Sequence, residues 1–205
     1  TTARGTAHLA ARAVGVVAGL EVVDEVLTQV AERLELETPR LELRAADGDR
    51  VAPGDVLAVL DGPVQVLLVA ERTMLNLVCR ASGVASHTRR FADLLEGTGA
   101  TVLDTRKTTP GLRELEKAAV RAGGGTNKRM GLFDVAMIKD NHLVATGSVT
   151  GAIEAVRARF PEVAIQVEAD TLEQAVEAVA AGADFLLLDN MAPELLRRVV
   201  ATVRE

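Results

Sequence analysis

Residues 165–190, IQVEADTLEQAVEAVAAGADFLLLDN, contain two short apolar runs on either side of a helix-like segment. The runs IQVEAD (165–170) and FLLLDN (185–190) are short and aliphatic, which predicts strands. Between them, apolar residues recur at helical spacing over 171–181. A strand, a helix and a second strand in this order predict two parallel strands joined by a crossover helix.

The same alternation continues on both sides of this stretch. Strands are predicted at 101–105 and 135–140, and helices at 111–122, 148–159 and 193–204. Strands this apolar suit a parallel sheet that is buried on both faces, which places the chain in the α/β class.

The first part of the chain follows another order. Apolar periodicity predicts a helix at 20–35, a second at 64–80, and a third at 84–96 after an interruption at Gly83. One strand is predicted within 6–19, and short strands are predicted around turns within 40–60.

This change of rhythm predicts two domains, residues 1–97 and residues 98–205. The N-terminal residues lack the basic start and unbroken apolar core of a signal peptide. The pattern at the two ends predicts a chain that begins in mid-structure and stops as a helix ends. We therefore expect the first domain to lack its start and the second to lack its last strands.

The composition excludes several classes of function. With 48% hydrophobic and 25% charged residues, the chain has the make-up of an ordinary globular protein. A net charge of −6 and the absence of Trp and Tyr disfavour binding to nucleic acid. No apolar run is long enough to span a membrane. A single cysteine, Cys79, cannot form an internal disulfide, which favours a reducing, cytoplasmic setting.

Charged residues stand at the ends of four predicted strands. Arg106, Lys107 and Lys139 supply cations, and Glu168 and Asp189 supply carboxylates. One polar strand end is an ordinary transition to a loop, but four in succession favour a site at one edge of a sheet. Cations of this kind bind phosphate or carboxylate, and the carboxylates could hold Mg²⁺ or stabilise positive charge on a sugar. Phosphoribosyl transfer from a diphosphate donor would use both groups.

The segment AGGGTNKRMGL (122–132) lies between the first two of these strands. Its three consecutive glycines allow close approach by a ligand, although a flexible loop would have the same composition. Lys128 and Arg129 follow the glycines directly. The spacing is not that of a Walker A loop.

Five motifs together resemble one family, the quinolinate phosphoribosyltransferases, or nicotinate-nucleotide diphosphorylases (carboxylating). The motifs are ERTMLNL (71–77), LDTRKTTPGLRELEKAAVRAGGG (103–125), NKRMGL (127–132), IKDNH (138–142) and LLLDN (186–190). The resemblance implies a small α/β sandwich domain followed by an incomplete parallel α/β barrel. It also implies conversion of quinolinate and phosphoribosyl diphosphate to nicotinate mononucleotide, diphosphate and CO₂, with Mg²⁺, in NAD biosynthesis.

The same resemblance implies a homodimer in which Arg72 is donated across the subunit interface to the quinolinate carboxylates. It places Thr105, Arg106 and Lys107 on residues that contact substrate, and Arg129 on a second arginine that binds carboxylate.

The remaining site residues also follow from the resemblance. Lys139 falls on a lysine that meets substrate or the sugar donor, and Glu168 and Asp189 on carboxylates around the ribose and Mg²⁺. With Lys107, these three are the expected catalytic groups. Lys128 is expected to bind substrate, at a position where the family usually has histidine.

Three departures leave alternatives open. Lys128 replaces the usual histidine, Gln166 replaces a usual glutamate, and two phosphate-binding stretches that follow LLLDN in the family are missing. The alternatives are a drifted paralogue acting on another pyridine acceptor, and a truncated, inactive binding or dimerisation module. His142 is interpreted as a helix-capping or core-edge residue.

Overall fold

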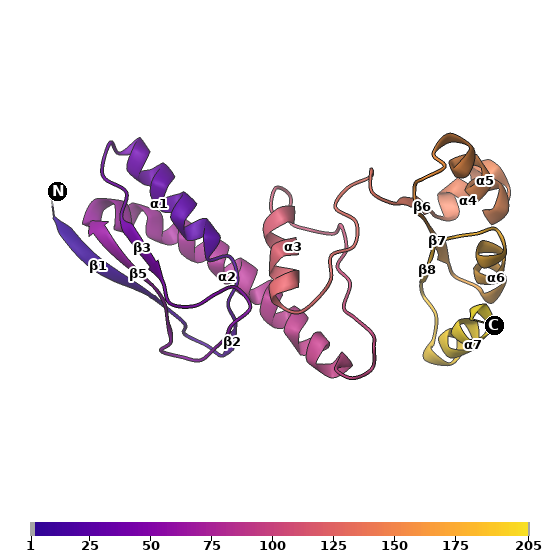
Figure 1. Ribbon diagram of the computed structural model, residues 1–205, viewed down its shortest axis with the longest axis horizontal. Coiled ribbons are helices and arrows are strands. Elements are labelled where there is room, and N and C mark those ends of the chain that lie inside the picture. Colours follow the sequence, from indigo (N-terminus) through magenta and orange to yellow (C-terminus); the bar gives the residue numbers. More distant parts are fainter. Residues whose placement is uncertain (1–2, 205) are drawn as a thin grey trace. The chain divides into compact units, whose positions relative to one another are not determined.

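The computed structural model of the chain describes residues 3–204, except for the side chains of Leu143 and Ala145. The chain forms two compact units, of which the first ends at Lys128 and the second begins at Arg129 (Figure 1). In the part of the chain that is described, no helix is both long and apolar enough to cross a bilayer.

The first unit is built on a three-stranded antiparallel sheet. Its strand order is β1 (Arg4–Ala10), β5 (Val56–Pro63) and β3 (Arg40–Leu43), which makes β5 the central strand. A separate ladder pairs β2 (Gly15–Val16) with β4 (Arg50–Val51). The N-terminal strand predicted from the sequence therefore forms as two strands, and the short strands predicted around turns are confirmed.

Helices α1 (Glu21–Arg33) and α2 (Val64–Leu95) pack on one face of this sheet (Figure 1). Alternation along β5 directs Ala58 and Leu60 toward them. The buried helix residues in this core are Val23, Leu27, Ala31, Val66, Leu67, Ala70, Met74 and Val78. The helix predicted at 20–35 is confirmed as α1.

Helix α2 runs unbroken over Val64–Leu95, so the predicted interruption at Gly83 and the separate helix at 84–96 are wrong. Glycine in a helix interior costs only about 1 kcal/mol relative to alanine. Ala81 and Ala85, on either side of the glycine, are fully buried in one cluster. Their packing offsets the weak helix propensity of Gly83.

The strand predicted at 101–105 is also wrong. The structure has a single parallel bridge there, between Leu103 and Thr126. Thr126 N donates to Val102 O at 2.8 Å, and Asp104 N donates to Thr126 O at 3.2 Å. Among the described residues the ladder extends no further, so the segment lacks the continuous pairing of a strand. The helix predicted after it is confirmed as α3 (Arg113–Ala122).

The second unit contains a three-stranded parallel sheet in the order β6 (Ala136–Ile138), β7 (Ile165–Ala169) and β8 (Phe185–Leu188). Figure 1 shows its helices on one side of the sheet. They are α4 (Asp140–Thr146), α5 (Val149–Arg159), α6 (Leu172–Ala180) and α7 (Pro193–Val203). The predicted parallel β-α-β order is confirmed, with α4 as an addition that the sequence did not predict.

The two faces of the parallel sheet differ in burial. Val167 and Leu186, which are paired across strands, pack with buried residues of the helices. Gln166 and Phe185 are also paired and point to the opposite face, where Phe185 is 45% exposed. Within the residues that the structure describes, burial is therefore confirmed for the face under the helices and only in part for the opposite face, where Gln166 is 6% exposed.

Side-chain caps fix the starts of two helices in this unit. Ser148 Oγ accepts from Gly151 N at 3.0 Å, and Thr171 Oγ1 accepts from Gln174 N at 3.2 Å. Because Thr171 follows the end of β7 by only two residues, its cap keeps the loop after that strand short.

Candidate functional site

The carboxylate of Asp104 connects two segments of the first unit that carry predicted site residues. Asp104 directly precedes the first segment, 105–107, and is hydrogen-bonded to the second, 127–128. Its Oδ1 accepts from Lys117 Nζ at 2.6 Å and from the backbone N of Lys128 at 2.7 Å. Its Oδ2 accepts from Asn127 Nδ2 at 2.7 Å. The side chains of Lys117 and Asp104 are only 1% and 6% exposed. Buried charges need such additional hydrogen bonds, and the amides of Asn127 and Lys128 supply them.

A second buried charge, Glu116, contacts the chain five residues after Asp104. Its Oε1 accepts from Arg80 Nη2 at 2.7 Å, and its Oε2 accepts from the backbone N of Thr109 at 3.2 Å. Burial is the largest single influence on the pKa of Glu116 and would raise it. The hydrogen bonds from Thr109 and Arg80 together outweigh burial and hold that pKa below its ordinary value.

Thr105, Arg106 and Lys107 lie between these two anchors. Thr105 and Lys107 are exposed, and Arg106 is half-buried. Thr105 Oγ1 accepts from Lys107 N at 3.0 Å, and Arg106 O accepts from Thr108 N at 2.9 Å. Arg113 Nη2 also donates to Arg106 O, at 3.4 Å. The backbone is thus held while the three predicted site side chains keep their charged or hydroxyl ends available. A cavity of about 230 Å³ has Thr105 and Lys107 in its lining.

The glycine run before Asn127 packs tightly against α2. A Cβ on Gly123 would lie 2.4 Å from Ala85 O, and a Cβ on Gly125 would lie 2.9 Å from Thr88 Cγ2. Gly124 has a φ of +82°, a left-handed conformation that favours glycine. The glycines therefore allow close approach by the chain's own helix, whereas the sequence suggested a ligand or a flexible loop.

In the second unit, Lys139 and Glu168 form an ion pair at the carboxyl edge of the parallel sheet. Lys139 Nζ lies 2.6 Å from Glu168 Oε2, and the two side chains are 43% and 15% exposed. Lys139 follows β6 directly, Glu168 lies near the end of β7, and Asp189 follows β8. Because these strands are parallel neighbours, their three charged ends share one edge. Asp189 is exposed, and its Oδ1 accepts from Asn190 N at 2.9 Å.

His142 caps helix α4. Its Nδ1 accepts from Lys139 N at 3.0 Å. Lys139 immediately precedes the helix and His142 is the third helical residue, so this is the reach-back hydrogen bond of a capping box. The helix-capping interpretation of His142 is confirmed.

Arg129 is held within the second unit. It is half-buried, its Nη1 donates to Val135 O at 3.2 Å, and its Nη2 lies 3.2 Å from Met137 Sδ. Arg72 lies on α2 in the first unit and is exposed. The predicted site residues are therefore divided between the two units. The first unit holds Arg72, Thr105, Arg106, Lys107 and Lys128, and the second holds Arg129, Lys139, Glu168 and Asp189.

Gln166, where the family usually has glutamate, is 6% exposed in the middle of β7. Within the described residues, its Oε1 has no hydrogen-bond partner. A neutral amide is less costly at this position than a carboxylate would be, because burying an unpaired charge costs much more free energy than burying an unpaired dipole.

Sequence reasoning missed the buried charges Glu116 and Lys117. A signal was present for Glu116, which lies four residues after Leu112 and three before Ala119 on the apolar face of α3, whereas Lys117 lies off that stripe, three residues before Val120. Charged residues in an apolar stripe indicate buried partners.

In the described part of the chain, no three His, Cys, Asp or Glu side chains gather in a way that could hold a metal ion by themselves. Mg²⁺ usually binds through one or two carboxylates together with substrate phosphates and water. Glu168 and Asp189, on neighbouring strand ends, fit that second mode of binding.

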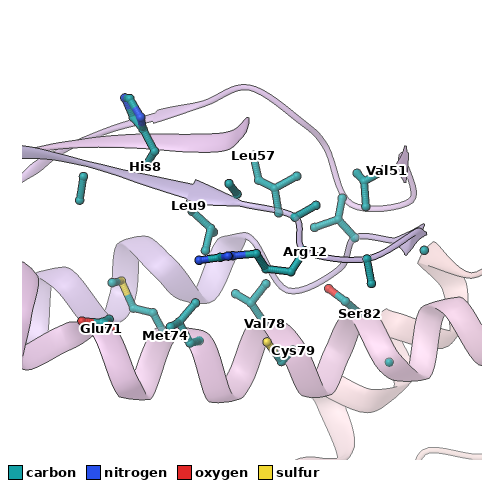
Figure 2. Close-up of a pocket in the computed structure, with 18 of the residues that line it drawn as sticks. His8, Leu9, Arg12, Val51, Leu57, Glu71, Met74, Val78, Cys79 and Ser82 are labelled. Atoms are coloured by element: carbon teal, nitrogen blue, oxygen red, sulfur yellow. The ribbon is translucent and has the colours of Figure 1, made fainter. Parts of the chain in front are cut away.

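A larger cavity, of about 680 Å³, lies in the first unit against α2 (Figure 2). Its lining is mainly apolar and includes Leu57, Met74 and Val78, and Figure 2 shows the side chain of Arg12 extended along it. None of the predicted site residues lines this cavity. The chemistry predicted from the sequence therefore does not belong to it.

Two family models match the chain. The N-terminal domain of quinolinate phosphoribosyl transferase matches residues 1–82, and the C-terminal domain of the same enzyme matches residues 84–205.

Curated relatives agree with these models. The chain is 47% identical to the nicotinate-nucleotide pyrophosphorylase (carboxylating) of Mycobacterium leprae, over 90% of the chain and 64% of that protein. It is 45% identical to a probable enzyme of the same name from Bacillus subtilis, over 93% of the chain and 65% of that protein. The chain thus spans slightly less than two thirds of the length of these two relatives.

Solved structures show the same similarity. The nicotinate-nucleotide pyrophosphorylase of Francisella tularensis superposes with a TM-score of 0.93 at 32% identity, over 100% of this chain and 71% of that chain. NadC from Streptococcus pyogenes gives 0.90 at 40% identity, over 98% of this chain and 70% of that one. With both domain models, the curated relatives and these structures in agreement, the chain belongs to the quinolinate phosphoribosyltransferase family.

Proposed function

We propose that the protein is a nicotinate-nucleotide diphosphorylase (carboxylating). It would convert quinolinate and phosphoribosyl diphosphate to nicotinate mononucleotide, diphosphate and CO₂ in NAD biosynthesis. The observation that carries the proposal is the match to both domains of the family, over residues 1–82 and 84–205. The names of the relatives support the same activity.

Quinolinate has two carboxylates, and this chain supplies arginines for them. Arg106 and Arg129 are each half-buried, and a guanidinium in such a position can bind a carboxylate through two hydrogen bonds. Arg72, exposed on α2, would complete the set from the second subunit of a homodimer. Neutralising both carboxylates would fix the ring with its nitrogen directed toward the sugar.

The sugar donor would meet lysines and carboxylates. Lys107, Lys128 and Lys139 carry the positive charge that its phosphates require. Glu168 and Asp189 lie at neighbouring strand ends, where carboxylates would stabilise positive charge developing on the ribose. These two residues would also hold Mg²⁺, which neutralises charge on the departing diphosphate when it is bound.

The chemistry then needs no side-chain nucleophile. The ring nitrogen forms a bond to the anomeric carbon as the bond to diphosphate breaks. The resulting pyridinium loses the adjacent carboxylate as CO₂, because the positive nitrogen stabilises the carbanion that remains, and a proton then replaces the carboxylate. Thr105, Arg106 and Lys107 would contribute by positioning and by electrostatics.

Two finer features complete the proposal. The three-stranded parallel sheet would be part of an incomplete α/β barrel, and the first unit would be the small α/β sandwich of the family. The single cysteine of the chain supports a reducing, cytoplasmic setting.

The test is an assay of the whole protein with quinolinate, phosphoribosyl diphosphate and Mg²⁺, following nicotinate mononucleotide and CO₂. Formation of both products is the expected result. If a folded protein gives no product with quinolinate but uses another pyridine carboxylate, the drifted paralogue replaces this proposal. Lys128 and Gln166 are the residues to revert first in that case.

A further inference from the structure

Two consecutive residues of α3 hold the two ends of one loop. Lys117 Nζ lies 2.6 Å from Asp104 Oδ1 at the start of the loop, and Glu116 Oε2 accepts from the backbone N of Thr109 at its end. The residues between these ends, 105–108, include two cations of the proposed site, Arg106 and Lys107.

Stability alone does not explain these two charges. The side chains of Glu116 and Lys117 are 9% and 1% exposed. A buried ion pair is generally no more stabilising than a well-packed apolar pair of the same shape. An apolar residue at position 116 would extend the buried face of α3 that Ala119 occupies, and one at position 117 would be enclosed in the same way as the present lysine stem. The retained charges therefore point to a role in fixing the loop.

Each anchor has a further partner of its own. Asp104 is held further by Asn127 Nδ2, and Thr109 is held further by Arg80 Nη2 through its hydroxyl, at 3.0 Å. The loop is thus tied at one end to the segment that carries Lys128 and at the other end to α2.

We propose that Glu116 and Lys117 are positioning residues, which hold the loop at 105–108 in a single conformation before any ligand binds. The inference rests on the proposed function, which places Arg106 and Lys107 on the two substrates. A loop fixed in advance loses less conformational entropy when a pyridine dicarboxylate or a diphosphate binds. Neither Glu116 nor Lys117 needs to touch the ligand.

The test is hydrogen exchange of the whole, ligand-free protein, together with calorimetric titration of quinolinate. In Glu116→Ala and in Lys117→Met, amides at 105–109 are expected to exchange at least about tenfold faster, while amides of α1 do not change. Quinolinate affinity is expected to fall by about tenfold or more in both variants.

Two further variants keep the test decisive. Lys117→Met leaves the carboxylate of Asp104 buried without its cation, so the neutral double variant Asp104→Asn/Lys117→Met serves if the single variant does not fold. Its asparagine presents one oxygen where the carboxylate presents two, so Asn127 Nδ2 and Lys128 N no longer each have an acceptor of their own, and faster exchange at 105–108 is still expected. Leu27→Ala, in the core of the same unit, destabilises the fold without touching the loop.

Each outcome decides one question. Wild-type exchange of the loop in folded Glu116→Ala or in the double variant would overturn the proposal. Equal acceleration of the loop in Leu27→Ala would reduce the two charges to a general structural role. A wild-type protein that binds no quinolinate would remove the proposed function, while the exchange data would still decide the role of the two anchors.

Discussion

Arg106 combines a half-buried charged side chain with a backbone that the loop holds in place. Its carbonyl, and not its guanidinium, makes the hydrogen bonds to Thr108 and Arg113. Arg106→Ala should therefore leave the melting temperature nearly unchanged and lower the turnover of quinolinate by at least about 100-fold. A product assay measures the turnover, and thermal denaturation measures the melting temperature. Arg197→Ala, an exposed change on α7, is the control, and retained turnover in Arg106→Ala would remove this residue from the mechanism.

Glu116 gives a pH-dependent contribution to stability. Its pKa lies below the ordinary value of 4.5 in the folded chain, so its contribution is complete above that value. The contribution is lost as the pH falls through the lowered pKa. The difference in unfolding free energy between wild type and Glu116→Gln should therefore shrink from about pH 6 to about pH 3. Urea denaturation at several pH values measures this difference in unfolding free energy. A difference that stays constant with pH would contradict the lowered pKa of Glu116.

At the scale of single residues, the sequence showed which charged groups to examine but not what they contact. The charged strand ends at Lys139, Glu168 and Asp189 follow from residue order, because polar residues after a buried strand must lie at its end. The burial of Lys117 does not follow in this way. It depends on a carboxylate thirteen residues earlier in the chain, brought close by a backbone bridge that propensity cannot predict.

At the scale of elements, Gly83 and Gly123 should respond in opposite ways to alanine. A Cβ on Gly83 meets nothing within 4 Å inside a continuous helix, so Gly83→Ala should stabilise the protein by up to about 1 kcal/mol. A Cβ on Gly123 would strike Ala85 O, so Gly123→Ala should destabilise by about 1–3 kcal/mol. Chemical denaturation of both variants makes the comparison, and equal effects would contradict the packing described for the glycine run.

Helices with a clear apolar stripe were predictable, and elements set by tertiary pairing were not. The stripe of α1 is visible in the sequence, and so are the alternating elements around β7. The failures at Gly83 and at 101–105 both depend on tertiary contacts, which local propensity does not contain. Burial kept α2 intact, and a missing ladder left residues 101–105 outside the sheet.

At the scale of the whole molecule, the proposed homodimer makes a prediction about mixed subunits. If Arg72 acts on the site of the other subunit, Arg72→Ala and Arg106→Ala are each inactive alone. A mixed dimer of the two retains one intact site of two. Random mixing yields half mixed dimers, so activity should return to about one quarter of wild type. Refolding the two variants together, with each variant alone as the control, measures this recovery. No recovery, from a mixture shown to exchange subunits, would place Arg72 within its own subunit's site or outside any site.

The buried ion pair of Lys117 also has a consequence for the amine chemistry of this chain. Its four lysines are Lys107, Lys117, Lys128 and Lys139, and elsewhere the positive side-chain charge is carried by arginine, which acylating agents do not modify readily. Lys117 is enclosed and paired, so an acyl donor would react with the exposed Lys107 and with the partly exposed Lys139 instead. Acetylation of lysine side chains in this chain would therefore fall on the proposed site and remove charge there, while the fold and its buried lysine stayed intact.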